Sequence, residues 1–267
     1  MKPSTERDVY DDAPGNLPRH ARIRQGNSGG DRIEAMRVQD LGTMNYRDAW
    51  AVQEAAHAEV LAGGEERILF AEHAPVITFG RRPGVERNVI ASDDQLVAAG
   101  VEVVQSDRGG DVTFHGPGQV VAYPIIRLND HRLSVGGYVR ALERAVIATL
   151  ASFGIASAHR QDKAVGIWVG ETPETSAKVC AIGVRIRRGV SLHGLALNVT
   201  TDLRYFNLIV PCGLIGRPVT SLAALLNGSL PPLPRVKDEL GARLAEAVGV
   251  PSSGMPGEGE CESSLPG

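Results

Sequence analysis

Apolar residues recur at helical spacing in four segments of the chain. In Tyr46–Ala62 they return every three or four positions until a Gly-Gly pair, which predicts a helix that ends there. Leu133–Phe153 shows the same period and also stops at a glycine. Shorter segments with this spacing predict helices over Val219–Leu226 and Val236–Val248.

Runs rich in β-branched and aliphatic residues alternate with these helices and predict strands. The predicted strands are Arg67–Glu72, Pro75–Phe79, Val101–Gln105, Val120–Ile126, Gly166–Val169, Lys178–Arg188 and Val190–Val199. Several follow one another in hairpin-like succession. The fold class predicted is therefore α+β, with a mixed or antiparallel sheet flanked by helices.

Both ends of the chain lack any hydrophobic period. Residues 1–33 and 251–267 are rich in Pro, Gly, Ser and charged residues, and we expect both to be disordered. The folded domain is therefore expected at 34–250. The first 30 residues carry no apolar core of a secretory signal, and no apolar run reaches the length of a transmembrane helix.

Composition narrows the class of protein. The 267 residues carry a formal net charge of −3, which argues against general nucleic-acid binding because such proteins favour a basic surface. The three cysteines form no paired spacing and indicate free thiols in a reducing compartment. We expect a cytoplasmic protein that binds neither nucleic acid nor membrane.

The segment Arg108–Gln119 (RGGDVTFHGPGQ) is the most unusual part of the sequence. Four glycines, a proline and a histidine lie within these twelve residues, just before a predicted strand. Glycine beside a strand marks a bend or a place where the backbone approaches another group closely. The segment predicts a site that holds a small ligand against main-chain amides, although a Gly-rich hairpin with a surface histidine is the plainer interpretation.

Two residues suggest nucleophilic chemistry. Cys212 lies between a proline and a glycine, a turn that can present a thiol, although a lone cysteine is more often a small buried hydrophobe. A thiol has an ordinary pKa of about 8.5, so a nucleophilic cysteine needs a base. Lys178 begins a predicted apolar strand where partial desolvation would suit it to that task, unless it is an ordinary solvated strand-end lysine.

Three histidines are further candidates for orienting a substrate or moving a proton: His73, His115 and His193. A zinc site is the competing interpretation. The sequence contains no Cys-x-x-Cys pair and no His-Glu-x-x-His helix, so we expect no metal.

Taken together, these motifs resemble the octanoyltransferases of lipoate biosynthesis, also called lipoyl(octanoyl) transferases or the lipoate-protein ligase B family. The matching segments, in one order across residues 35–250, are Glu72–Pro75, Arg108–Gln119, Lys178–Gly183, His193–Asn198, Asp202-Leu203 and Pro211–Gly213. The combination of RGGxxT[aromatic]HGPGQ with a downstream PCG is a specific signal for this family. The resemblance implies the fold of the catalytic domains of biotin and lipoate protein ligases.

The resemblance also implies a reaction. An octanoyl or lipoyl group moves from acyl carrier protein to a lysine of an apo lipoyl domain, as found in 2-oxoacid dehydrogenases and in glycine cleavage H protein. Cys212 is implied to carry the acyl thioester and Lys178 to take its proton. No metal, nucleotide or other cofactor is implied because the thioester is already activated, and we expect a monomer.

The resemblance further implies which residues line the acyl substrate site. They are Arg108, Gly109, Gly110, Asp111, Val112, Thr113, Phe114 and His115, then Ala181, Ile182 and Gly183, and finally Gly194, Leu195 and Ala196. Glycine amides near a thioester can stabilise a developing oxyanion.

Two positions depart from the family pattern. Phe114 stands where the family usually has tyrosine, so we expect one hydroxyl to be missing from the pocket wall. Cys180 stands where alanine is more usual, and in a regular strand it would share a face with Lys178. Cys180 is therefore a rival nucleophile, although the Pro/Gly frame favours Cys212.

Three other functions remain open from the sequence. An ATP-dependent ligase on the same fold would need groups that recognise a nucleotide, and the chain lacks the GRGRRG run of biotin ligases. A non-catalytic protein could bind acidic acyl carrier protein through Arg185, Arg187 and Arg188, which otherwise read as a charged strand edge. A cysteine hydrolase would release the acid to water.

Overall fold

The structure is a computed structural model that describes residues 36–161, 164–210, 216–226 and 230–249. The two ends predicted to be disordered, 1–33 and 251–267, lie outside the described residues. So does Cys212, the candidate nucleophile.

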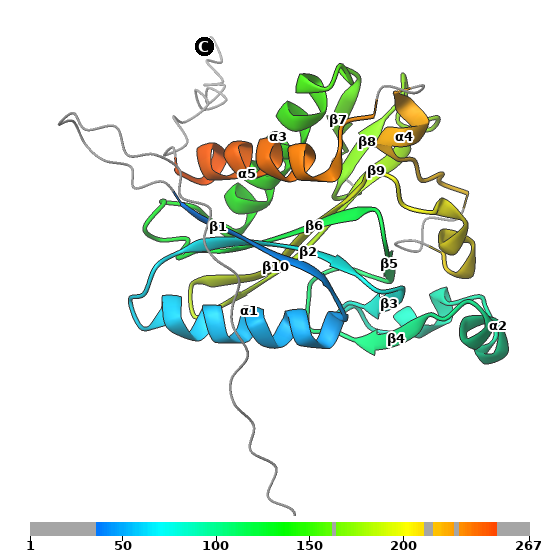
Figure 1. The fold of residues 1–267 in the computed structure, drawn as a ribbon, viewed down its shortest axis with the longest axis horizontal. Coiled ribbons are helices and arrows are strands. Elements are labelled where there is room, and N and C mark those ends of the chain that lie inside the picture. Colours follow the sequence, from blue (N-terminus) through cyan, green and yellow to red (C-terminus); the bar gives the residue numbers. More distant parts are fainter. Residues whose placement is uncertain (1–35, 162–163, 211–215, 227–229, 250–267) are drawn as a thin grey trace, which may run out of the picture. The chain divides into compact units, whose positions relative to one another are not determined.

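A mixed sheet forms the centre of the fold (Figure 1). Its strands, among the described residues, run in the order β1-β2-β6-β10-β9-β8-β7, and only β1 and β2 pair in parallel. The strands are β1 (Arg37–Met44), β2 (Arg67–His73), β6 (Gln119–Ile125), β7 (Ala158–Arg160), β8 (Ile167–Val169), β9 (Ala177–Arg187) and β10 (Val190–Asn198). The mixed sheet confirms the α+β class.

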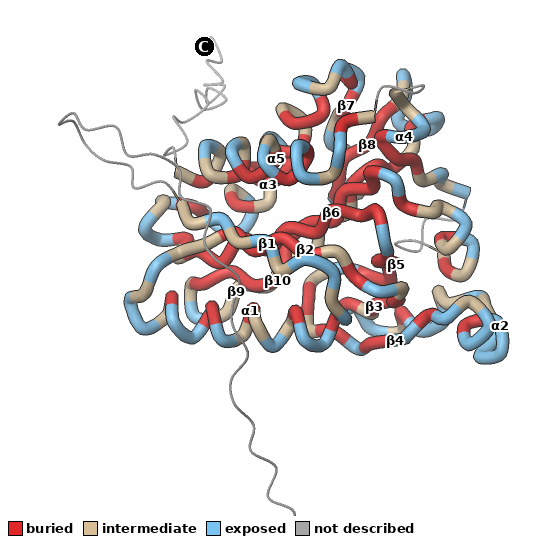
Figure 2. The backbone as a smooth tube through the Cα atoms, viewed as in Figure 1, coloured by how far each residue is buried: buried red, intermediate tan, exposed pale blue. Residues whose placement is uncertain are grey.

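Helices cover both faces of this sheet (Figure 1). Helix α1 (Tyr46–Leu61) lies on one face and packs Ala49, Ala56 and Val60 against alternate residues of β2, β6 and β10. Helices α3 (Val135–Ser152) and α5 (Leu233–Gly249) lie on the other face, over a second apolar cluster. The central strands are accordingly buried on both sides (Figure 2).

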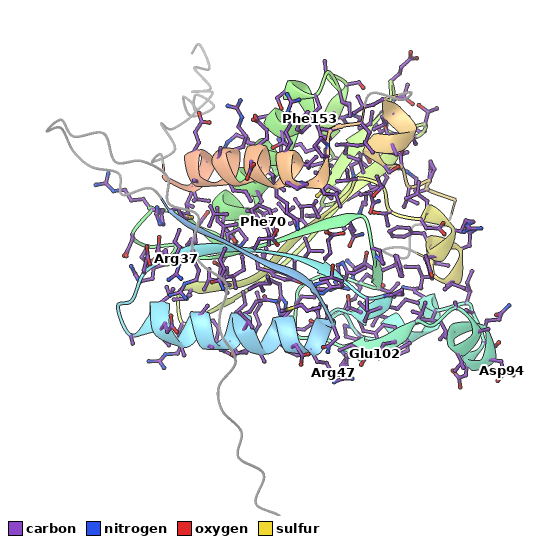
Figure 3. All side chains as sticks on the ribbon, in the orientation of Figure 1. Arg37, Arg47, Phe70, Asp94, Glu102 and Phe153 are labelled. Atoms are coloured by element: carbon purple, nitrogen blue, oxygen red, sulfur yellow. The ribbon has the colours of Figure 1, made fainter. Side chains whose placement is uncertain are left out.

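Side-chain contacts at the labelled positions in Figure 3 show how the layers are joined. Phe70 of β2 lies beneath α5, and Arg235 of α5 lies 5.7 Å from the ring of Phe153. On the opposite face, Arg47 of α1 forms a 2.8 Å ion pair with Glu102 (Figure 3). Glu102 begins a strand of a second, smaller sheet.

The smaller sheet carries the Gly-rich segment. It has the order β4-β3-β5, with β3 (Val76–Phe79), β4 (Glu102–Gln105) and β5 (Thr113–His115), and the short helix α2 (Asp93–Ala98) precedes β4. The amide of Gly109 donates to the carbonyl of Val184 at 2.9 Å, which joins the loop before β5 to β9 of the large sheet. The Gly-rich segment is therefore fixed between the two sheets.

The sequence predicted most of these elements and missed four. The three long helices α1, α3 and α5 and the predicted strands are present, whereas β1, α2, β5 and β7 were not expected. The helix expected over Val219–Leu226 is reduced to α4 (Leu222–Leu225). Val219 instead pairs with Lys178 as an isolated parallel bridge, so the start of that segment is extended.

Candidate active site

A cavity lies between the Gly-rich segment and strands β9 and β10. Its lining, within the described part of the chain, consists of Tyr46, Arg108, Gly110, Asp111, Val112, Thr113, His115, Val121, Tyr123, Val165, Lys178, Ala181, Ile182, Gly183, His193, Gly194, Leu195 and Ala196. Three segments distant in sequence thus meet around one space. They are the three segments from which the resemblance drew its substrate residues, and Lys178 joins them.

Twelve of the fourteen residues expected to line the substrate site border this cavity, and Gly109 and Phe114 do not. Gly109 instead holds the segment to Val184 through its amide. The ring of Phe114 is stacked on Tyr205 with centroids 4.6 Å apart and lies edge-on to Phe206.

The expectation that Phe114 removes a hydroxyl from the pocket wall is therefore wrong. Thr113 and His115 border the cavity, and the residue between them on strand β5 points to the opposite face. The identity of residue 114 affects the packing around Tyr205 rather than the cavity.

Lys178 borders the cavity and is buried, with 6% of its surface exposed. Its Nζ donates to the carbonyl of Val165 at 3.1 Å and lies 4.8 Å from the centre of the Trp168 ring. Its main chain pairs with Pro218 and Thr220. The alternative of a solvated strand-end lysine is excluded, and the amino group is held by these contacts.

Cys180 lies on the other side of strand β9 from Lys178. A register shift between β8 and β9 pairs Ile167 with Cys180 and Trp168 with Lys178, so the extra residue, Val179, interrupts the alternation of faces. Ala181, not Cys180, shares the cavity with Lys178.

The thiol of Cys180 is fully buried in the apolar cluster beneath α3 and α5. Burial raises its pKa to about 12. The interpretation of Cys180 as a rival nucleophile is therefore wrong, because the thiol is buried away from the cavity. The sequence suggested otherwise because the bulge that turns Cys180 to the other face cannot be seen in the sequence of a strand.

Arg108 is a buried cation in the wall of the cavity. Its guanidinium donates to the hydroxyl of Thr78 from Nε and to the carbonyl of Thr78 at 2.6 Å, and a further N–H reaches the carbonyl of Gly109. A buried charge is costly unless it is hydrogen-bonded, and these contacts meet that requirement. They also fix the side chain of Arg108 against β3.

His73 and Tyr123 form a buried pair beside the cavity. Burial lowers the pKa of His73 to about 4, so its ring is neutral at pH 7. Nδ1 donates to the carbonyl of Met44 at 3.1 Å, and Nε2 consequently accepts the hydroxyl proton of Tyr123 at 2.6 Å. Tyr123 and Tyr46 lie within segments predicted as a strand and a helix, and neither was expected at the site.

His193 has an unusual backbone at the cavity wall. Its φ of 57° is in the left-handed region, which costs free energy for a residue that carries a side chain. Nε2 lies 2.6 Å from a carboxylate oxygen of Asp107, and the ring packs on Trp50 of α1. Burial lowers the pKa of His193 to about 3. The neutral ring therefore donates from Nε2 to Asp107.

The basic cluster proposed to meet an acidic partner is largely neutralised. Arg185 forms an ion pair with Asp107, and Arg187 pairs with Glu54. Arg188 is exposed at the turn between β9 and β10. These pairs favour the alternative in which the cluster is a charged strand edge.

The described residues contain neither a metal-binding cluster nor a membrane-spanning helix. No group of three or more His, Cys, Asp or Glu side chains in ranges 36–161, 164–210, 216–226 and 230–249 is placed to hold a metal ion. None of the helices described is long and apolar enough to cross a membrane.

The chain matches the lipoyl protein ligase A/B catalytic domain over residues 45–245. It is 50% identical over 189 residues to the octanoyltransferase of Solibacter usitatus, and the aligned region covers 70% of this chain and 82% of that relative. It is 46% identical over 214 residues to the octanoyltransferase of Chloroflexus aggregans, covering 79% and 94% respectively. The chain belongs to the octanoyltransferase family. Octanoyltransferases are acyltransferases, so the family assignment makes this chain an enzyme of that class.

Solved structures of lipoate protein ligases share the fold. A lipoate-protein ligase A bound with ATP superimposes with a TM-score of 0.67 at 19% identity, covering 80% of this chain and 86% of the other. A T. acidophilum protein with bound lipoic acid gives a TM-score of 0.65 at 20% identity, with the same coverage. At these identities the likeness concerns the fold, and it confirms the predicted catalytic-domain architecture.

Proposed function

We propose that this protein transfers an octanoyl or lipoyl group from acyl carrier protein to a specific lysine of an apo lipoyl domain, through a thioester on Cys212. The observation that carries the proposal is the cavity itself. It is bordered by the three family segments and by the buried side chain of Lys178. A buried amino group thus borders the space that we propose receives the acyl chain.

The ends of the segment that contains Cys212 support this role. Val210, two residues before it, donates from its amide to the carbonyl of Asn88 at 2.7 Å, and the side chain of Asn88 donates to Asp111 of the cavity wall. Beyond the segment, Pro218 and Thr220 pair with the main chain of Lys178. Val210 is thus linked to the cavity residue Asp111 through Asn88, and Pro218 and Thr220 are linked directly to Lys178.

The proposed reaction has two balanced steps. Lys178 takes the proton of the Cys212 thiol and the sulfur attacks the donor thioester. The carbon–sulfur bond to the donor then breaks, and the donor thiolate takes the proton from Lys178. The amine of the acceptor lysine then attacks the acyl-cysteine, an amide forms, and the proton lost by the amine returns to Cys212 through Lys178. We propose that the positive charge of the buried Arg108, in the cavity wall, stabilises negative charge on the carbonyl oxygen.

The remaining expectations belong to the same proposal. We assign the catalytic unit to residues 34–250, within which the family match at 45–245 lies. The proposed acceptors are the lipoyl domains of 2-oxoacid dehydrogenases and glycine cleavage H protein. We propose a cytoplasmic monomer that needs no cofactor.

The test is an acylation assay that omits ATP and acceptor. The protein is incubated with octanoyl-acyl carrier protein, and its intact mass is recorded beside Cys212→Ser and Cys180→Ser. We expect an octanoyl adduct on the wild type and on Cys180→Ser, and none on Cys212→Ser. Adding an apo lipoyl domain should then move the octanoyl group to that domain.

Three outcomes would contradict the proposal. An adduct that persists in Cys212→Ser would place the nucleophile elsewhere. Product that forms only with ATP and free octanoate would indicate a ligase. Release of free octanoate at the same rate with and without the acceptor would indicate a hydrolase.

A further inference from the structure

A chain of buried hydrogen bonds runs from the cavity wall to the strand of Lys178. His115 Nδ1 lies 2.7 Å from Oε1 of Gln119, and Nε2 of Gln119 donates to Oδ1 of Asn198 at 2.8 Å. Nδ2 of Asn198 donates to the carbonyl of Thr220 at 3.0 Å, and the amide of Thr220 donates to the carbonyl of Lys178 at 2.9 Å. The three side chains are each at most 6% exposed.

The direction of every bond in this chain is determined. The carbonyl of Thr220 can only accept, so the Asn198 atom facing it is the amide nitrogen, and its oxygen faces Gln119. The Gln119 nitrogen also donates to the carbonyl of Phe114 at 3.2 Å. This second bond requires the same orientation of the Gln119 side-chain amide as the bond to Asn198. The Gln119 oxygen therefore faces His115 and must receive a proton from Nδ1.

The other ring nitrogen of His115 consequently carries a lone pair. Burial lowers the pKa of His115 well below its usual value, and the neighbouring His73 and Arg108 lower it further, so the ring is neutral. Tyr46 covers one face of the ring, with centroids 5.8 Å apart and planes within 10°. The side chain borders the cavity, and among the described residues Nε2 makes no hydrogen bond.

We propose that Gln119 and Asn198 are positioning residues that hold His115 with its proton on Nδ1, so that Nε2 accepts a hydrogen bond from an N–H group of the substrate. Neither amide borders the cavity, so both act through His115. The functional part of this proposal rests on the acyl transfer proposed above. Two substrates of that reaction carry such a group: the amide of the pantetheine arm of the donor, and the amine of the acceptor lysine.

The tautomer can be measured without any substrate. The protein is labelled with 15N-histidine, and the ring nitrogens of His115 are assigned by the signals that vanish in His115→Gln. We expect a protonated Nδ1 and an unprotonated Nε2 between pH 6 and 8. In Gln119→Met the opposite tautomer should appear, because the acceptor of the Nδ1 proton is lost. Asn198→Asp should keep the wild-type tautomer, because its carboxylate still accepts from Nε2 of Gln119. Thr149→Val, which removes a buried hydroxyl of α3 that bonds Ala145, is the matched control and should leave the tautomer unchanged.

Single-turnover kinetics separate the two sources of the N–H group. His115→Phe removes the acceptor, whereas His115→Gln keeps an oxygen near the position of Nε2. We expect His115→Phe to slow one half-reaction by about 3- to 10-fold, the effect of one hydrogen bond, and His115→Gln to recover most of that rate. A slower acylation by octanoyl-acyl carrier protein identifies the pantetheine amide, and a slower transfer to the lipoyl domain identifies the lysine amine.

The outcomes also separate this proposal from the proposed function. A proton on Nε2 in the wild type would overturn the positioning role of Gln119 and Asn198. Wild-type rates in both half-reactions of His115→Phe would overturn the role of Nε2 as an acceptor. If the wild type forms no acyl adduct at all, the proposed function fails, while the NMR measurement still decides the tautomer.

Discussion

At the scale of single residues, the structure contrasts two buried lysines. Lys178 borders the cavity, whereas Lys237 on α5 is paired with Asp40 and Glu72 at the opposite face of the sheet. Both side chains are largely covered, with 6% and 8% of the residue exposed. They therefore form a matched pair in which burial is similar and position differs.

We predict that Lys178→Met slows acylation of the enzyme by about 100-fold or more, the usual contribution of a general base. Lys237→Met should keep the rate close to that of the wild type, although it loses some stability with its ion pairs. Intact-mass measurements during a single turnover with octanoyl-acyl carrier protein give both rates. Equal rates in Lys178→Met and wild type would remove Lys178 from the mechanism.

Cys180 gives a second prediction at this scale, based on burial. Its pKa is raised to about 12 because the thiol is buried, so at pH 8 it is both protonated and covered. Iodoacetamide should leave Cys180 unmodified in the native protein and modify it in urea, as read by peptide mass. Modification of the native protein within minutes would show that the thiol is accessible and would restore it as a candidate nucleophile.

At the scale of secondary-structure elements, the close approach of β10 to β6 requires a glycine. A Cβ on Gly194 would lie 2.0 Å from the carbonyl oxygen of Ala122, so two paired strands would have to separate. Gly136, in the first turn of α3, has open space, because the nearest atom to an added Cβ is the end of the Arg140 side chain at 3.5 Å. The same substitution should therefore have opposite effects at the two positions.

We predict that Gly194→Ala lowers the free energy of unfolding by about 1–3 kcal/mol through overpacking. Gly136→Ala should raise it by about 0.5 kcal/mol, because alanine loses less conformational freedom in a helix than glycine. Urea denaturation followed by circular dichroism gives both values. A Gly194→Ala protein as stable as the wild type would show that β10 and β6 can move apart at little cost.

The elements that the sequence predicted are those whose pattern follows from burial alone. Strands β6 and β10 are buried along their whole length and are rich in aliphatic residues, and α3 buries one stripe. Strand β1 lies at the edge of the sheet and mixes exposed and half-buried positions, so its sequence RVQDLGTM carries no clear period. Strand β5 has three residues and could not be told from the Gly-rich loop around it.

The site was predictable where a motif marks it and not where geometry decides it. Glycines, His115 and Lys178 mark the cavity in the sequence, and the structure brings them together. The face of β9 that carries Cys180 depends on a bulge, and the left-handed backbone of His193 depends on tertiary packing. Tyr46 and Tyr123 border the cavity from regular elements, and a hydroxyl within an otherwise apolar strand was the one signal for Tyr123.

At the scale of the whole molecule, the buried histidines make folding depend on pH. His73, His115 and His193 all have lowered pKa values because of burial, to about 4 for His73 and about 3 for His193. As the pH falls below about 6.5, the histidine pKa in the unfolded chain, the unfolded chain binds protons at these positions and the folded chain does not. The free energy of unfolding therefore falls. His131 behaves in the opposite way, because its hydrogen bond to Glu66 raises its pKa. The contribution of His131 to the free energy of unfolding is fully present below about pH 6.5, and it is lost only as the pH rises through the pKa of His131 in the folded chain.

We predict that the free energy of unfolding falls steeply between pH 6 and 4.5, by up to about 4 kcal/mol per pH unit. Each of the three histidines with a lowered pKa contributes about 1.4 kcal/mol per pH unit to this slope. His73→Gln should reduce this slope by about one third, whatever its effect on stability at pH 7.5. His131→Gln should leave the slope unchanged and instead weaken the pH dependence above pH 6.5. Urea midpoints measured at half-unit steps of pH test all three proteins. A flat profile for the wild type between pH 6 and 4.5 would mean that these histidines accept protons in the folded state, and the neutral rings assigned to the cavity wall would then be wrong.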